Sequence, residues 1–243
     1  MRACEPTVAD FVEQGGVKVF YEVFGDGEPT IMLMPTWPII HSRMWKAQVP
    51  YLARRFRVVT FDPRGTGRTE RPSASESYGD LEQVADGLAV MDASGADRVV
   101  VVGACDRWGI TLAAEQPERV IGLVTLAPWL PMGPADFPEI DFDAILDTDD
   151  GWAKENRHYW LRDWPGYVRF FMEEMLPEQH STKQIDDTVA WGLEVDAETM
   201  LLVEDRPRFP ATETEAEELC RRVRCPVLIV QGDHDLIIPP VWS

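Results

Sequence analysis

Short runs of apolar and β-branched residues, typical of strands, open the chain. The stretch at 17–23 alternates apolar with polar positions, whereas the runs at 30–34 and 57–61 are continuous. Residues 81–91 then carry apolar side chains at helical spacing, and the pattern stops at Ser94-Gly95. The order predicts three strands followed by a helix.

The same pattern continues to residue 127. A fully apolar run at 99–102 predicts a strand, residues 110–116 predict a short helix that ends before Pro117, and 120–127 predict another strand. Strands that are continuously apolar and separated by helices indicate βαβ units. We therefore expect an α/β protein with a mostly parallel sheet flanked by helices.

The pattern changes between residues 128 and 210, where prolines and acidic residues are followed by aromatic residues at helical spacing. Strand-like runs are not evident there, and this segment is predicted to be an inserted helical cap. A helix at 215–222, with Thr214 as its N-cap, and a buried strand at 226–231 then resume the α/β pattern. The predicted core is thus residues 1–127 and 211–243, and the cap is 128–210.

Composition and charge narrow the classes of partner. The 243 residues are 45% hydrophobic and have a formal net charge of -19, which leaves no basic field for nucleic acid or an anionic membrane. The start, Met1 to Phe11, has no apolar run, and no later stretch approaches the ~20 apolar residues that span a bilayer. Four scattered cysteines indicate free thiols. These features predict a cytoplasmic protein.

Several short motifs carry a family resemblance. The apolar strand at 99–102 runs into Gly103-Ala104-Cys105-Asp106-Arg107-Trp108-Gly109 and then a helix, which is the context of a nucleophile elbow. Here the chain resembles the α/β-hydrolase superfamily over nearly its whole length. Further matches, in family order, are Met34-Pro35-Thr36-Trp37, Asp62-Pro63-Arg64-Gly65-Thr66-Gly67-Arg68-Thr69, Gln116-Pro117-Glu118-Arg119-Val120 and Gln231-Gly232-Asp233-His234-Asp235.

The resemblance implies roles for four residues. Cys105 stands at the nucleophile position and Asp235 at that of the triad acid, and the amides of Trp37 and Asp106 would form the oxyanion hole. Dienelactone hydrolases use a cysteine at this position. The N-terminus of the following helix is expected to lower the pKa of this thiol, although the adjacent Asp106 opposes the effect. No cofactor is implied.

The register of the elbow stays open. The family usually has glycine two residues after the nucleophile, whereas this chain has Arg107 there and glycine only at Gly109. If the turn is displaced by one residue, Asp106 becomes the raised residue, as in dehalogenases and epoxide hydrolases. A third alternative is that the turn carries no nucleophile.

The triad histidine is the main departure from the family. Only eight residues follow Asp235, so the last strand and the histidine loop of the fold are expected to be missing. The chain has four histidines, of which His41 and His158 are weighed as relocated bases and His180 and His234 are not. Each of the four fits a surface or hydrogen-bonding role better.

Two further features have structural explanations. The aromatic residues of the cap fit a core between cap and sheet better than the lining of an acyl pocket. The acidic cluster at 141–150 lacks the glycine and the terminal glutamate of an EF-hand loop, so a solvated surface is expected there rather than a metal site.

Two functions remain in competition. The first is a cofactor-free hydrolase acting on a small carboxylic ester, lactone or thioester with an apolar portion, weakly because the histidine is absent. The second is a non-catalytic pseudo-hydrolase, or a binding or signalling module of a longer protein, since members of this family occur fused to nucleotide cyclases. The strand at 226–231 would be an unprotected sheet edge, and a homodimer through this edge is expected.

Overall fold

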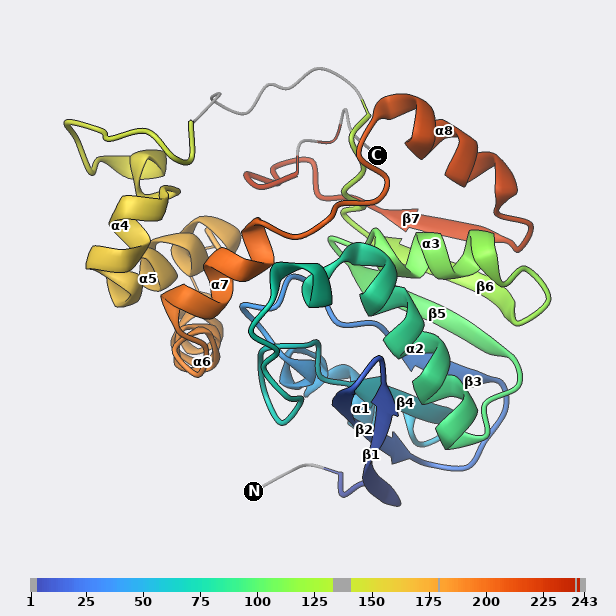
Figure 1. Ribbon diagram of the computed structural model, residues 1–243. Coiled ribbons are helices and arrows are strands. Elements are labelled where there is room, and N and C mark those ends of the chain that lie inside the picture. Colours follow the sequence, from blue (N-terminus) through green and yellow to red (C-terminus); the bar gives the residue numbers. More distant parts are fainter. Residues whose placement is uncertain (1–3, 133–140, 179, 239, 241–243) are drawn as a thin grey trace.

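The computed structural model describes residues 4–132, 141–178, 180–238 and 240. A sheet with strand order β1-β2-β4-β3-β5-β6-β7 runs through this part of the chain (Figure 1). Its strands are β1 (Val8–Gln14), β2 (Val17–Phe24), β3 (Thr30–Leu33), β4 (Arg57–Phe61), β5 (Val99–Ala104), β6 (Val120–Leu126) and β7 (Val227–Val230). Pairing is parallel from β4 to β7 and antiparallel at β1 and β2. The predicted α/β class and mostly parallel sheet are confirmed.

Helices lie on both faces of this sheet. The helices α2 (Asp80–Ser94), α3 (Trp108–Glu115) and α8 (Glu213–Arg222) share one apolar core with the strands. The short helices η1 (Ser42–Trp45) and α1 (Gln48–Leu52) pack on the opposite face, mainly against β3 and β4. Burial on both sides explains the continuously apolar sequence of the central strands, in which Met32 and Val101 have no exposed surface.

The two ends of the sheet differ from the sequence prediction. Strand β1 was not predicted, because its residues are mostly exposed; Gly15 and Gly16, both at positive φ, form the tight turn that pairs it with β2. Strand β7 lies at an edge of the sheet, as predicted for the run at 226–231, and its four residues are 47–57% exposed, so the prediction that this run is buried is wrong. An apolar run alone does not tell which strand of a sheet is central. Pairing of this edge with a second copy stays a prediction.

A group of helices separates β6 from α8 in the chain and lies to one side of the sheet (Figure 1). They are η3 (Gly151–Lys154), α4 (Arg157–Arg162), α5 (Trp164–Met175), α6 (Thr182–Gly192) and α7 (Ala197–Glu204), and η2 (Ser75–Tyr78) packs against α7. Their buried side chains, among them Trp160 and Tyr167, form a core that also takes in Ile39, Ile40 and Tyr78. As expected, most aromatic residues of this segment are core.

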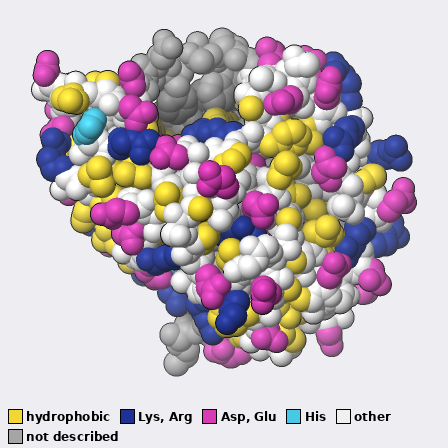
Figure 2. Space-filling model, in the orientation of Figure 1, with side chains coloured by type: hydrophobic (Ala, Val, Ile, Leu, Met, Phe, Trp, Pro, Cys, Tyr) yellow, Lys and Arg dark blue, Asp and Glu magenta, His cyan; other side chains and the backbone are white. Residues whose placement is uncertain are grey.

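Figure 2 shows the charged side chains on one face of the molecule. On the face drawn in Figure 2, Asp and Glu side chains lie among Lys and Arg side chains, although acidic residues are in excess, 42 against 23. In the described part of the chain, no helix combines the length and apolar character needed to cross a membrane.

Helix α8 begins two residues earlier than predicted. Thr212, not Thr214, is its N-cap: the Thr212 hydroxyl accepts a hydrogen bond from the amide of Glu215 at 3.3 Å, and the Glu215 carboxylate accepts one from the amide of Thr212 at 3.2 Å. This reciprocal pair is a capping box. The spacing of three residues between Thr212 and Glu215 is also visible in the sequence, whereas the prediction placed the cap at Thr214, nearer the apolar residues.

We expect Thr212→Ala to lower the free energy of unfolding by about 1 kcal/mol. The amide of Glu215 loses the hydroxyl that accepts its hydrogen bond, and the reciprocal pair at the start of α8 is broken. Chemical denaturation measures the change. Thr214→Ala, two residues further into the helix, is the matched control and should change stability by less than half as much. Equal losses in the two variants would contradict the assignment of the cap.

Candidate active site

The turn between β5 and α3 is strained at Cys105. This residue has φ of +50°, a left-handed conformation that non-glycine residues rarely adopt, and its amide donates a hydrogen bond to the carbonyl of Leu126 at 2.9 Å. Helix α3 begins three residues later, at Trp108. A strained residue on a sharp strand-to-helix turn is the geometry of a nucleophile elbow.

Asp106 has a different environment. Its side chain is buried, and Oδ1 accepts a hydrogen bond from the amide of Gly109 at 2.6 Å, whereas Oδ2 has no partner among the described residues. A Cβ atom on Gly103 or Gly109 would lie 2.2 or 2.1 Å from this carboxyl group. The two glycines therefore make room for the Asp106 side chain beneath the turn, and burial raises the pKa of this carboxyl to about 7.

The loop after β3 brings backbone amides beside the elbow. The amide of Met34 donates to the carbonyl of Val102 at 2.8 Å, which extends the pairing of β3 with β5, and the chain then turns through Thr36 and Trp37. Trp37 and Asp106 both line a cavity at this place. Within the described residues, neither of their amides donates to a backbone carbonyl. These donors are therefore available to a ligand.

Asp235 follows β7 and lies close enough to Cys105 for its charge to act on the sulfur. Its Oδ1 accepts hydrogen bonds from the amides of Ile237 at 2.9 Å and Ile238 at 2.8 Å. This loop thus folds back on its own carboxylate, and the roles of Asp235 and Cys105 stay predictions.

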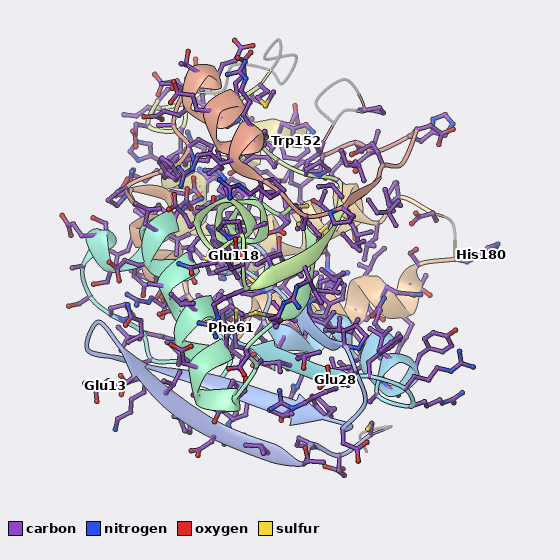
Figure 3. All side chains as sticks on the ribbon, turned by 90° about the vertical axis from the view of Figure 1, so that its right-hand side faces the viewer. Glu13, Glu28, Phe61, Glu118, Trp152 and His180 are labelled. Carbon is purple, nitrogen blue, oxygen red and sulfur yellow. The ribbon has the colours of Figure 1, made fainter. Side chains whose placement is uncertain are left out.

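The four histidines lie elsewhere. His41 is buried, with Nε2 3.4 Å from a Glu194 carboxylate oxygen, and burial lowers its pKa. His158 contacts the Asp143 carbonyl through Nε2 at 3.1 Å. His180 and His234 are exposed, and Figure 3 shows His180 at the periphery. None of these histidines is among the described residues that line the cavity.

The surroundings of Cys105 disfavour its thiolate. Burial, together with the charges of Asp235 and Asp106, raises the pKa of this thiol to about 12, and a hydrogen bond from the Thr36 side chain offsets this only in part. The expectation that the helix N-terminus would lower the pKa is wrong. Two carboxylates and little water outweigh the partial charge of a short helix.

The cavity beside Cys105 has a volume of about 390 Å³. Its walls come from the β5–α3 turn, the loop after β3, the segment between β6 and α8, and the residues after β7, and most of them are apolar. The apolar and aromatic lining residues are Pro35, Trp37, Ile39, Ile40, Trp108, Trp129, Trp152, Phe171, Met175, Ile237 and Ile238. The aromatic residues of the segment 128–210 were expected to form core, but two of them, Trp152 and Phe171, line the cavity.

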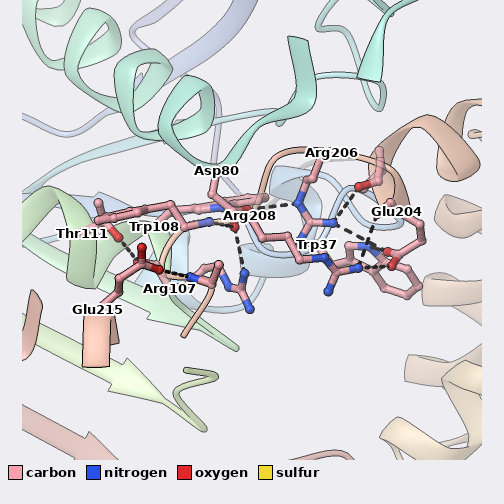
Figure 4. A network of polar contacts seen from close by, with 12 residues as sticks. Trp37, Asp80, Arg107, Trp108, Thr111, Glu204, Arg206, Arg208 and Glu215 are labelled. Atoms are coloured by element: carbon pink, nitrogen blue, oxygen red, sulfur yellow. Dashed lines mark hydrogen bonds and ion pairs between the residues drawn. The ribbon is translucent and has the colours of Figure 1, made fainter. Parts of the chain in front are cut away.

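A polar network forms part of the cavity wall (Figure 4). The buried carboxylate of Asp80 accepts hydrogen bonds from Arg107 Nη1 at 2.8 Å and from Arg206 Nε at 3.0 Å. The Glu204 carboxylate accepts from Arg208 Nη2 at 2.6 Å and from Trp37 Nε1 at 3.1 Å. Sequence reasoning missed this network, although the arginine in place of the family's glycine was a visible signal.

Glu155 is a further acidic group at the cavity. The hydroxyl of Tyr167 donates a hydrogen bond to its carboxyl group, and burial raises the pKa of Glu155 to about 8. At neutral pH this side chain is therefore mostly uncharged.

Comparisons with known sequences identify similar proteins. A family model described as the alpha/beta hydrolase fold matches residues 29–241. A protein named as a carbamate hydrolase of Caulobacter sp. (strain K31) is 28% identical over 80% of this chain and 69% of its own. Epoxide hydrolase B of Mycobacterium tuberculosis is 35% identical, but over 43% of this chain and 31% of its own.

Solved structures share the fold. A hydrolase from Pseudomonas aeruginosa PA01 superposes with a TM-score of 0.74 at 22% identity, covering 98% of this chain and 85% of that one. Est816, described as an N-acyl homoserine lactone degrading enzyme, superposes with a TM-score of 0.73 at 23% identity, covering 96% and 85%. At these identities the likeness establishes architecture alone.

We expect Asp106→Asn to remove a pH-dependent loss of stability. An acid whose folded-state pKa is raised stabilises the folded state while protonated, and this contribution disappears as pH rises from about 4 through 7. The wild type should therefore lose up to about 4 kcal/mol relative to the variant over this range. Denaturant titrations at pH 4.5 and 8 measure the difference. Asp97→Asn, at an exposed carboxylate, is the control, and a variant with the wild-type slope at position 106 would contradict the prediction.

We also expect the thiol of Cys105 to be alkylated by iodoacetamide at pH 8 more slowly than that of Cys220, which is exposed. Asp235→Asn removes one of the charges that raise the Cys105 pKa and should increase its labelling rate severalfold, while the rate at Cys220 stays constant. Mass spectrometry of peptides follows both sites. Faster labelling of Cys105 than of Cys220 in the wild type would contradict this electrostatic analysis.

Proposed function

The chain belongs to the α/β hydrolase fold family, and from that membership we propose that its cavity binds a small carboxylic ester, lactone or thioester whose acyl carbon is attacked by Cys105. The observation that carries the proposal is the positive φ of Cys105 at a strand-to-helix turn beside the cavity. The competing register would need the side chain of Asp106 in the cavity as nucleophile. That carboxyl group is instead enclosed by Gly103 and Gly109.

The proposed reaction is a two-step acyl transfer. The Cys105 thiolate forms a bond to the acyl carbon, and the free amides of Trp37 and Asp106 donate to the oxyanion that develops. Collapse of the tetrahedral intermediate breaks the bond to the leaving alcohol or thiol, which takes up a proton. Water then hydrolyses the acyl-cysteine and releases the acid, restoring the thiol.

Proton removal limits this chemistry. A thiol with a pKa of about 12 is ionised at a level of about 10⁻⁵ at pH 7. In the family mechanism a histidine takes this proton and an acid orients the histidine. Here the charge of Asp235 raises the pKa of the thiol, and no histidine lines the described part of the cavity. We therefore propose weak hydrolysis.

The names of similar proteins support acyl chemistry without selecting a substrate. An esterase from Exiguobacterium antarcticum and an enol-lactonase from Burkholderia xenovorans share the fold, with TM-scores of 0.74 and 0.63. The curated relatives include proteins named for carbamate, peroxidase and epoxide chemistry. An apolar cavity of about 390 Å³ accommodates a small acyl compound of the proposed class.

A second candidate function is ligand binding without turnover. The raised pKa of Cys105 is the observation that favours it, because the same cavity then holds ligands and leaves them unreacted. Both candidates use one cavity and differ in the fate of the bound molecule.

We expect hydrolysis of p-nitrophenyl butyrate that is slow at pH 7 and rises about tenfold per pH unit up to pH 9, because the thiolate fraction rises in that proportion. Release of nitrophenolate, corrected for spontaneous hydrolysis, measures the rate. Cys105→Ala should abolish it, and Cys220→Ala should leave it unchanged. Turnover that survives Cys105→Ala would exclude the proposed nucleophile, and absence of turnover at every pH would favour the binding function.

A further inference from the structure

Three guanidinium groups lie on one part of the cavity wall. Arg107 comes from the elbow turn, and Arg206 and Arg208 come from the segment between α7 and α8. Arg107 and Arg206 are 4% and 9% exposed, so both are largely removed from solvent. The charges of Arg206 and Arg208 contribute to lowering the pKa of Arg107 to about 10, after the larger effect of burial, as expected for neighbouring cations.

Two carboxylates pair with these three cations. Asp80 binds Arg107 and Arg206, and Glu204 binds Arg208 at 2.6 Å, with Arg206 at 3.7 Å. The other acidic groups among the described lining residues do not complete the balance. Glu155, whose pKa burial raises to about 8, accepts a hydrogen bond from Tyr167, and Asp106 accepts one from the amide of Gly109. Among the described residues, neither carboxyl group forms an ion pair with these arginines. One positive charge therefore remains without a counter-ion among the described residues of this wall.

The cluster is also held in place without a ligand. The Arg107 guanidinium carbon lies 3.8 Å from the ring centroid of Trp129, and its Nη1 donates to Asp80. Among the described residues, only Nη1 of this guanidinium has a hydrogen-bond acceptor, so its remaining N–H groups can still donate. Fixed orientation and free donors are the two properties that a site for a planar anion requires.

We propose that this arginine cluster binds a carboxylate group of the ligand, and that the preferred substrates are acyl compounds that carry a free carboxylate. The second statement rests on the proposed function; the first does not. A single excess charge matches a monocarboxylate better than a phosphate, which brings up to two charges at neutral pH. The apolar remainder of the cavity, with Trp37, Trp152 and Phe171, contacts the carbon skeleton.

The whole chain would otherwise repel such a ligand, since its formal net charge is -19. Attraction of an anion must therefore come from this local cluster, which acts at short range inside a cavity where water screens it less than at the surface. For this reason, substitutions that change one charge in the cluster should have large effects, and equal changes on the outer surface should have small ones.

The test measures binding of 4-phenylbutyrate and its neutral amide by calorimetry at pH 7 and needs no turnover. We expect the carboxylate to bind the wild type at least about tenfold more tightly than the amide. Arg208→Gln leaves the cluster without an excess charge and should bring this ratio close to one. Glu204→Gln adds an excess positive charge and should increase the ratio severalfold, while its amide oxygen can still accept from Trp37.

Arg221→Gln is the matched control, because Arg221 is exposed on α8 and pairs with Glu217. It should keep the wild-type ratio. Equal affinity for carboxylate and amide in the wild type, or the same loss in Arg221→Gln as in Arg208→Gln, would overturn the proposal. Ester hydrolysis that fails while the carboxylate preference holds would reject the proposed function alone, and hydrolysis without that preference would reject this inference alone.

Discussion

The buried carboxylate of Asp80 is the interaction on which the arrangement of the cavity depends. It lies at the first turn of α2 and accepts four hydrogen bonds, from Arg107, Trp108 and Arg206 side chains and from the amide of Phe209 at 2.9 Å. Burial alone would raise its pKa, but the charges of Arg206 and Arg107 outweigh burial and hold the pKa below its ordinary value. Substitution of Asp80 by a residue without a carboxylate would therefore leave buried hydrogen-bond donors without an acceptor.

This carboxylate joins segments that are far apart in the chain. Arg107 and Trp108 begin the helix that follows the elbow, whereas Arg206 and Phe209 connect the last cap helix to α8. The link extends through Glu204 to the indole of Trp37, in the loop after β3. The same set of polar contacts therefore joins the β5–α3 turn, the segment that leads into α8 and one wall of the cavity.

The sequence predicts most of the sheet because central strands need apolar residues on both faces, and the strands at 30–33, 57–61, 99–104 and 120–126 meet that requirement, while the alternating pattern at 17–24 is itself typical of a strand. The prediction is less accurate at the edges of the sheet, where β1 is polar and β7 is apolar yet exposed.

Three of the residues that the family resemblance implied, Cys105, Trp37 and Asp106, line one cavity. The charge of the fourth, Asp235, acts on Cys105, and the roles of all four stay predictions. The arginine network was not predictable from local pattern, since its partners are up to 167 residues apart. Charge pairing across such separations has no periodicity that a sequence reading can detect.

The electrostatics of the two sides of the cavity oppose each other. At the sulfur, Asp235 and Asp106 act on Cys105 with the same sign as the thiolate and suppress its formation. At the other wall, three arginines outnumber two carboxylates and favour an anion. In the family mechanism an imidazolium lies between the acid and the nucleophile, and its positive charge turns the acid from a group that destabilises the developing anion into one that supports its counter-ion. No histidine lines the described part of the cavity, and the charge of Asp235 disfavours the thiolate of the proposed nucleophile, whereas the arginines of the opposite wall favour the proposed ligand carboxylate. The proposed binding and the proposed reaction thus depend on different charged groups.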